Sequence, residues 1–156
     1  MSVIISIDHS IGDLTQYTST VTGGGDLSVS AEAALAGTNY GLSCLINDTT
    51  VIYGVKTVSS NTSGKLRIRF YIDPNSLAMA NANMFEPWAL KTGTTYISYL
   101  EFYYFTASGY RLQPWLNLDS GDTSLAQTTI TDEPHYVEIY ITRAATNVSS
   151  DGTFSY

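Results

Sequence analysis

Residues 65–72 read Lys-Leu-Arg-Ile-Arg-Phe-Tyr-Ile, so polar and apolar side chains alternate along this stretch. The aromatic Tyr71 occupies one of the polar positions. Successive side chains of a β-strand point to opposite faces, so this alternation predicts a strand with one buried and one outward face. Three later stretches, residues 96–106, 110–118 and 135–142, follow the same period. Half-buried strands of this kind predict an all-β fold built from antiparallel sheets.

The inner sides of these four stretches form the expected core. The predicted core residues are Leu66, Ile68, Phe70, Leu100, Phe102, Leu112, Leu116, Val137, Ile139 and Ile141. The same period assigns Ile72, Tyr96, Tyr104, Tyr110 and Leu118 to the inner side. Two antiparallel sheets packed face to face would enclose such side chains, and we expect all four stretches to lie in one of the two sheets.

The opposite sides of the four stretches carry aromatic, basic, acidic and amide side chains. The candidate ligand-binding residues among them are Arg67, Arg69, Tyr99, Glu101, Tyr103, Arg111, Gln113, Trp115, Tyr136, Glu138 and Tyr140. If the strands are neighbours, these side chains share one continuous surface. Its composition is typical of a recognition face.

Turn-forming residues recur along the chain at the spacing of a β-sandwich. The predicted strands lie near residues 3–8, 16–21, 26–30, 39–46, 51–58, 65–72, 84–90, 96–106, 110–118, 126–130, 135–143 and 153–156. No linker, repeat or low-complexity segment interrupts this pattern. Residues 1–156 are therefore predicted to form a single β-sandwich domain.

The composition is typical of an extracellular or virion-surface β protein. Only 13% of the 156 residues are charged, and the net charge is −7. This acidity argues against nucleic acid and anionic membranes as partners. A chain of this length buries about two-thirds of its unfolded surface, so it needs no disulfide, and we expect the single Cys44 to be a buried thiol.

Residues 7–17, with the sequence IDHSIGDLTQY, resemble the opening element of bacterial and phage domains with the concanavalin A-like, laminin-G-like jelly roll. Three later segments, residues 36–42, 66–77 and 135–140, are similar to that family in the same order. The resemblance covers nearly the whole chain and implies a jelly-roll sandwich of two antiparallel sheets. Its motifs are mainly structural, so it implies the fold more specifically than a function.

Two departures from this family affect the expected partners and cofactors. Family members usually continue through two more strands beyond a segment like residues 151–156. The resemblance therefore implies either that residues 1–156 are a domain truncated at its C-terminus, or that other protein subunits or another chain complete the sandwich. Ser10 stands where the family often has a glutamate near a calcium site, and the closing aspartates are absent. Asp8 and Asp13 alone make a poor calcium cage, so we expect no metal and no other cofactor.

The residue inventory does not favour catalysis. The acidic strand motif of sandwich glycosidases, Glu-x-Asp-x-x-Glu, is absent. Glu101 and Glu138 could face each other across neighbouring strands as an acid pair, but ion pairs with Arg69 or Arg111 are the favoured interpretation. The two histidines have neither metal-ligand spacing nor a nucleophile beside them. We expect the protein not to be an enzyme.

Two non-catalytic functions remain for the outward side chains. In a carbohydrate-binding or adhesion module, the tyrosines and Trp115 would stack on sugar rings while the polar groups bind hydroxyls of a glycan or polysaccharide. In a structural subunit of a virion or surface assembly, such as a decoration, tail or filament protein, the same face would be an interface. A third interpretation is that these are ordinary solvent-facing strand residues.

Overall fold

The chain is described by a computed structural model over residues 5–58, 63–118, 121–145 and 151–156. These residues form twelve strands and no helix: β1 (Ser19–Val21), β2 (Leu27–Ser30), β3 (Gly41–Cys44), β4 (Tyr53–Val55), β5 (Lys65–Ile72), β6 (Met84–Thr92), β7 (Thr95–Phe105), β8 (Gly109–Leu118), β9 (Gly121–Ser124), β10 (Thr128–Ile130), β11 (His135–Thr142) and β12 (Thr153–Ser155). The predicted all-β class is confirmed. A helix able to cross a membrane is not found in this part of the chain.

Every predicted strand except one overlaps an observed strand, and one observed strand was not predicted. The strand predicted at residues 3–8 is wrong, because residues 5–8 are not in a strand; residues 3 and 4 lie outside the described residues. β9 has the polar sequence Gly-Asp-Thr-Ser, which lacks the alternation that predicts a strand. It forms because it pairs with the end of β8, an interaction that no local pattern announces.

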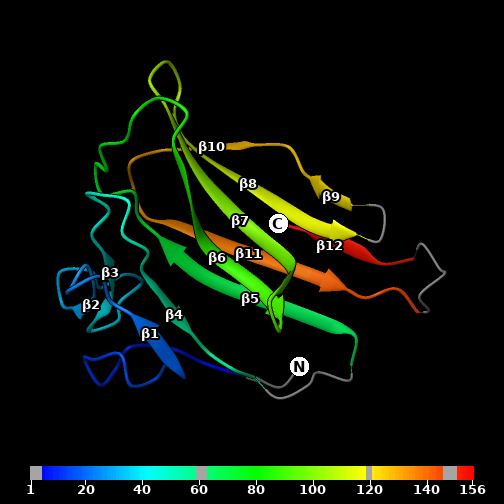
Figure 1. The fold of residues 1–156 in the computed structure, drawn as a ribbon, viewed down its shortest axis with the longest axis horizontal. Coiled ribbons are helices and arrows are strands. Elements are labelled where there is room, and N and C mark those ends of the chain that lie inside the picture. The colour runs from blue at the N-terminus through cyan, green and yellow to red at the C-terminus, as the bar shows by residue number, and fades with distance from the viewer. Residues whose placement is uncertain (1–4, 59–62, 119–120, 146–150) are drawn as a thin grey trace. The chain divides into compact units, whose positions relative to one another are not determined.

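The described residues group into two compact units. One contains those within Met1–Leu66 and Ile141–Thr153, and the other contains those within Arg67–Tyr140 and Phe154–Tyr156. The first unit holds two small sheets, β1–β4 and β2–β3. The second unit holds a five-stranded sheet, with the order β10–β8–β7–β6 and β9 beside β8, and most of a three-stranded sheet with the order β12–β11–β5 (Figure 1). These antiparallel sheets are compatible with a β-sandwich.

The four alternating stretches lie in two sheets, so the prediction that they share one sheet is wrong. β7 and β8 are neighbours in the five-stranded sheet, whereas β5 and β11 are neighbours in the three-stranded sheet. Period-two alternation indicates which side chains lie on the same face of one strand. It carries no information about which strands hydrogen-bond to each other. The outward side chains therefore belong to two different sheets.

The core of the second unit is centred on β7, which lies between β6 and β8. Leu100 and Phe102 are fully buried, and the Phe102 ring contacts Phe85 at 4.9 Å and Tyr110 at 5.4 Å between ring centroids. The predicted core residues that are buried are Leu100, Phe102, Leu112, Val137 and Ile139. Those that are half-buried are Leu66, Ile68, Phe70, Leu116 and Ile141.

Tyr96 does not lie among the core residues, although the alternation predicts it there. The register between β6 and β7 shifts between Leu90 and Lys91, and a bulge of this kind changes the direction of the side chains next to it. The Tyr96 ring contacts Tyr99 at 5.1 Å between centroids, and its hydroxyl donates to Glu86 Oε2 at 2.8 Å. The bulge thus moves one aromatic ring from the predicted inner side to the outer side.

Two further burial predictions are wrong for residues at strand ends. Leu118 is 45% exposed, because its cross-strand neighbour in β9 is Gly121, which has no side chain to cover it. Cys44 is exposed as the last residue of β3 in a two-stranded sheet, where few neighbours are available to cover it. The alternation misses Leu27 and Ile130, which are buried although their strands are short.

Replacing Phe102 by alanine is expected to lower the free energy of unfolding by about 3–5 kcal/mol, because a fully buried ring is removed from between Phe85 and Tyr110. Urea denaturation followed by tryptophan fluorescence measures the loss. Phe105→Ala is the control on the same strand, since Phe105 is only half-buried. Equal losses in the two variants would contradict the assignment of Phe102 to the core.

Candidate functional site

The pairing of β7 with β8 arranges six candidate residues in three rows. The rows are Tyr99 opposite Trp115, Glu101 opposite Gln113, and Tyr103 opposite Arg111. Residues directly opposite each other in an antiparallel pair share a face, with Cβ atoms about 4.5–5.5 Å apart. These six residues therefore form one continuous surface of the five-stranded sheet, which we call the aromatic face.

Tyr99 and Trp115 stack against each other on the aromatic face. Their rings are 3° from parallel, with centroids 5.8 Å apart, and both residues are half-buried. The neighbours on either side are small, since Ala89 of β6 pairs with Tyr99 and Ser124 of β9 pairs with Trp115. Small neighbours leave the two rings room to be contacted by a flat partner.

Glu101 lies next to this aromatic pair and is only 5% exposed. Its Oε2 atom accepts hydrogen bonds from the Trp115 indole N–H and from the Tyr103 hydroxyl, the latter at 2.5 Å. No arginine or lysine of the described residues lies within ion-pair distance of it. The predicted ion pair between Glu101 and an arginine is therefore wrong, because aromatic donors satisfy this carboxylate instead.

The aromatic face holds its tyrosines in the neutral form. Burial first, and then the hydrogen bond to Glu101, raises the pKa of Tyr103 to about 12. Burial, followed by the carboxylates of Glu101, Asp122 and Glu86, also raises the pKa of Tyr99. A neutral phenol keeps its proton and remains a hydrogen-bond donor.

Arg111 is held at the other end of the aromatic face by a side-chain network. Its Nη1 donates to Gln127 Oε1 at 2.9 Å, its Nη2 donates to Ser108 Oγ at 2.8 Å, and its guanidinium lies 4.9 Å from the Phe105 ring centroid. Gln127 in turn donates to Gln113 Oε1 at 3.0 Å. Arg111 Nε is buried and has no hydrogen-bond partner among the described residues. This network fixes the polar end of the face.

The remaining candidates lie on β5 and β11. Arg67 Nη2 is 2.9 Å from Glu138 Oε1, and Arg69 Nε is 2.6 Å from Glu138 Oε2, so the predicted ion pair of Glu138 with Arg69 is confirmed. Tyr136 donates to Glu138 Oε2 at 2.8 Å, and Tyr140 lies half-buried two residues beyond Glu138. Because these residues are on the other sheet, the prediction of one surface for all candidates is wrong.

Three residues that border the aromatic face are not among the candidates that the sequence predicts. Phe105 continues the odd-numbered side of β7 and could have been found by extending the alternation by one step. Tyr96 joins the face through a bulge, and Gln127 reaches it from the segment before β10. Neither of the last two leaves a signal in the local pattern.

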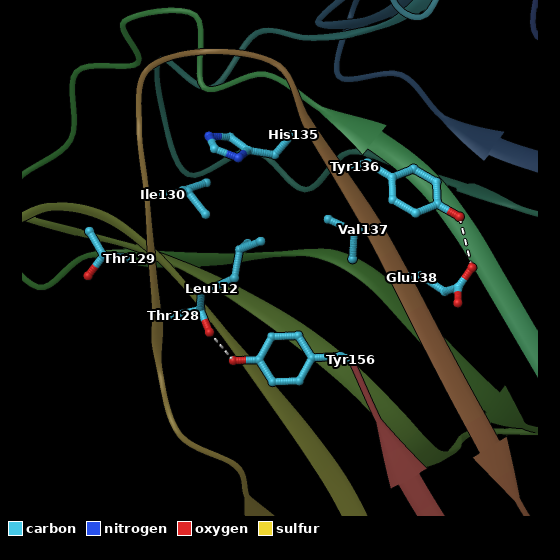
Figure 2. Close-up of a pocket in the computed structure, with 9 residues that line it drawn as sticks. All are labelled: Leu112, Thr128, Thr129, Ile130, His135, Tyr136, Val137, Glu138 and Tyr156. Carbon is cyan, nitrogen blue, oxygen red and sulfur yellow. Dashed lines mark hydrogen bonds between the residues drawn. The ribbon is translucent and has the colours of Figure 1, made fainter.

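The second unit also has a pocket of about 260 Å³ (Figure 2). It is lined by Leu112, Thr128, Thr129, Ile130, His135, Tyr136, Val137, Glu138 and Tyr156. Tyr156 and Thr128 bond to each other through their hydroxyls at 2.6 Å, and His135 Nε2 accepts from Thr131 N at 3.1 Å. Tyr136 and Glu138 project away from the apolar side chains (Figure 2). Only two of the candidate residues line this pocket, whereas six lie together on the aromatic face, so the aromatic face is the better candidate site.

The two aspartates considered for calcium make local hydrogen bonds. Asp8 Oδ1 accepts from Gln16 Nε2 at 2.7 Å and from Ser10 N at 3.0 Å, and these bonds lower the pKa of Asp8 to about 2. Asp13 Oδ1 accepts from the backbone and hydroxyl of Thr15. Across the described ranges, no three His, Cys, Asp or Glu side chains are grouped to hold a metal ion.

The raised pKa of Tyr103 predicts a loss of stability at high pH. In the unfolded chain this phenol ionises near 10, whereas in the folded chain it ionises near 12. Its contribution to stability is therefore complete below pH 10 and is lost as the pH rises from 10 to 12. Tyr103→Phe is expected to flatten this part of the stability curve, measured by urea denaturation at each pH. Tyr71→Phe, on the other sheet, is the control, and identical curves for wild type and Tyr103→Phe would contradict the assignment.

Comparison with known proteins adds no family assignment. No protein-family model, curated protein or solved structure matches this chain. The resemblance to concanavalin A-like, laminin-G-like domains stays a prediction, as does the jelly-roll topology that it implies.

Proposed function

We propose that this protein is a non-catalytic carbohydrate-binding or adhesion module that acts on an extracellular or virion surface. The aromatic face is the binding surface. The observation that carries the proposal is the nearly parallel pair of Tyr99 and Trp115, which lies beside the buried carboxylate of Glu101.

A sugar ring presents an apolar C–H face and a polar edge, and the aromatic face offers a partner for each. The stacked rings of Tyr99 and Trp115 provide apolar area of the kind that the C–H face of a sugar ring contacts. Gln113 lies in the adjacent row and Arg111 in the row beyond it, and their amide and guanidinium groups are of the kind that bind hydroxyls. Apolar contact area with a few fixed polar groups is typical of small-molecule sites.

The side chains of the aromatic face are held in place before any ligand arrives. The Trp115 indole is fixed by Glu101, and the Gln113 amide is fixed by Gln127 and by the Leu125 carbonyl. Binding then costs less side-chain entropy than it would with freely rotating groups. This supports a recognition role over that of ordinary solvent-facing strand residues.

The alternative function is that of a structural subunit in a virion or surface assembly. The exposed apolar side chains in the first unit favour it. Val21 and Tyr53 are directly opposite each other in the β1–β4 sheet, Val55 lies on the same side, and all three are exposed. Tyr17 packs against Gly54, on the other side of this sheet. A sheet with one covered face and one exposed apolar face is typical of a protein–protein contact.

The carbohydrate hypothesis predicts that Tyr99→Ala lowers affinity for a glycan ligand about two- to tenfold, because one stacking ring is lost. The Tyr99→Ala/Trp115→Ala double variant is expected to abolish binding. A glycan array identifies the ligand for the wild-type protein, and calorimetry with that glycan measures each affinity.

The matched control is Tyr40→Ala, which removes an exposed tyrosine from the first unit and should leave glycan affinity unchanged. Urea denaturation checks that each variant is folded, since Trp115 is also a hydrogen-bond donor to Glu101. Binding by the folded double variant at wild-type strength would exclude the aromatic face. No retention of the wild type on any glycan would overturn the carbohydrate hypothesis.

The assembly hypothesis predicts oligomers in sedimentation velocity at micromolar concentration. Val55→Ser is expected to shift the distribution towards the monomer, because it places a polar group in the apolar contact. Thr57→Ser is the conservative control on an exposed position just beyond β4. A wild-type protein that sediments only as a monomer would count against assembly through this face.

A further inference from the structure

The positive charge of this chain is concentrated on β5. Lys65, Arg67 and Arg69 are three of only seven lysine and arginine residues in a protein with a net charge of −7. All three are exposed and alternate with half-buried apolar residues, so they share the outward side of the strand. Such a concentration in an acidic protein makes β5 a candidate for a second binding surface.

Among the described residues, Glu138 supplies the only carboxylate that pairs with Arg67 and Arg69. It accepts from Arg67 through Oε1 and from Arg69 and Tyr136 through Oε2. One negative charge thus faces two guanidinium charges, which leaves an excess of one positive charge. We call Arg67, Arg69, Tyr136 and Glu138 the arginine face.

Each guanidinium uses only one of its nitrogen atoms for Glu138. Arg67 bonds through Nη2 and Arg69 through Nε. Among the described residues, no protein group accepts a hydrogen bond from Nε or Nη1 of Arg67, or from either Nη atom of Arg69. The two side chains are 41% and 54% exposed, so these unused N–H groups are accessible to a ligand.

We propose that the arginine face binds the carboxylate or sulfate groups of an acidic polysaccharide. A planar guanidinium presents paired N–H groups that match the oxygens of such anions. Residues two apart on one side of a strand are separated by about 6.6–6.8 Å, so Arg67 and Arg69 offer two anion contacts in a row. Glu138 competes with such an anion for both guanidinium groups. Tyr71 and Tyr136, with ring centroids 5.3 Å apart, provide an aromatic surface beside them.

This inference is independent of the glycan site on the aromatic face, because its residues and its ligand chemistry are different. General attraction cannot account for binding, because a protein of net charge −7 repels a polyanion. Retention on a polyanion would therefore require a local site. Polysaccharides that carry sulfate and polysaccharides that carry only carboxylate distinguish the two kinds of anion.

The test compares three polysaccharides as probes on affinity columns at neutral pH and about 50 mM salt. Heparin carries sulfate, polygalacturonate carries carboxylate only, and dextran is neutral. We expect retention on heparin or polygalacturonate, or on both, and none on dextran. Arg67→Gln and Arg69→Gln should each weaken binding about tenfold or more, since charge-assisted hydrogen bonds are lost. Lys56→Gln is the control because it makes the same change in net charge outside the arginine face.

Glu138→Gln separates contact with the ligand from a structural role of the arginines. It removes the competing negative charge, so affinity for the retained polyanion is expected to rise. Urea denaturation confirms that each variant is folded. Absence of retention of the wild type on both acidic columns, an equal loss in Lys56→Gln, or unchanged binding in folded Arg67→Gln and Arg69→Gln would overturn the proposal. A fall in affinity in folded Glu138→Gln would also overturn it.

Discussion

The hydrogen-bond register between β7 and β8 is the constraint on which the second unit depends. It places Phe102 opposite Leu112 on the inner side, and on the outer side it places Tyr99 opposite Trp115. A shift of one residue would turn every side chain of β7 to the other face, exposing Leu100 and Phe102 and burying polar groups. The burial of these two apolar side chains therefore also determines which rings stand together on the aromatic face.

Two glutamates in similar strand patterns have different environments. Glu101 is almost fully buried, and its partners are an indole N–H and a phenol; Glu138 is more exposed, and its main partners are two guanidinium groups. A buried carboxylate is costly unless hydrogen-bonded, so Glu101 ties Trp115 and Tyr103 to one arrangement. Glu138 instead pairs with two cations that remain accessible. The two outer surfaces consequently differ in chemistry, one aromatic and the other basic.

The two units differ in how much apolar surface they bury. Among the described residues of the first unit, Leu27 is the one buried apolar side chain. The second unit buries several, on β7, β8, β10 and β11. The small sheets of the first unit depend on close approaches such as that of Tyr17 to Gly54, where a Cβ atom would lie 2.6 Å from the ring. Two-stranded sheets with few buried contacts are marginally stable alone. The exposed valines and Tyr53 of β1 and β4 are consistent with this small core.

The alternation of residues 65–72 and of the three later stretches determined the all-β class, the strand positions and most of the side chains that face inward. It succeeded because the two-residue period is a local property of an extended backbone. It also identified the residues of both outer surfaces. Sequence alone did not reveal that β5 and β11 form a separate sheet from β7 and β8, that Tyr96 turns outward at a bulge, or that Glu101 is buried among aromatic donors. Only the tertiary structure decided these features, because strand neighbours, bulges and burial depend on contacts between residues far apart in the chain.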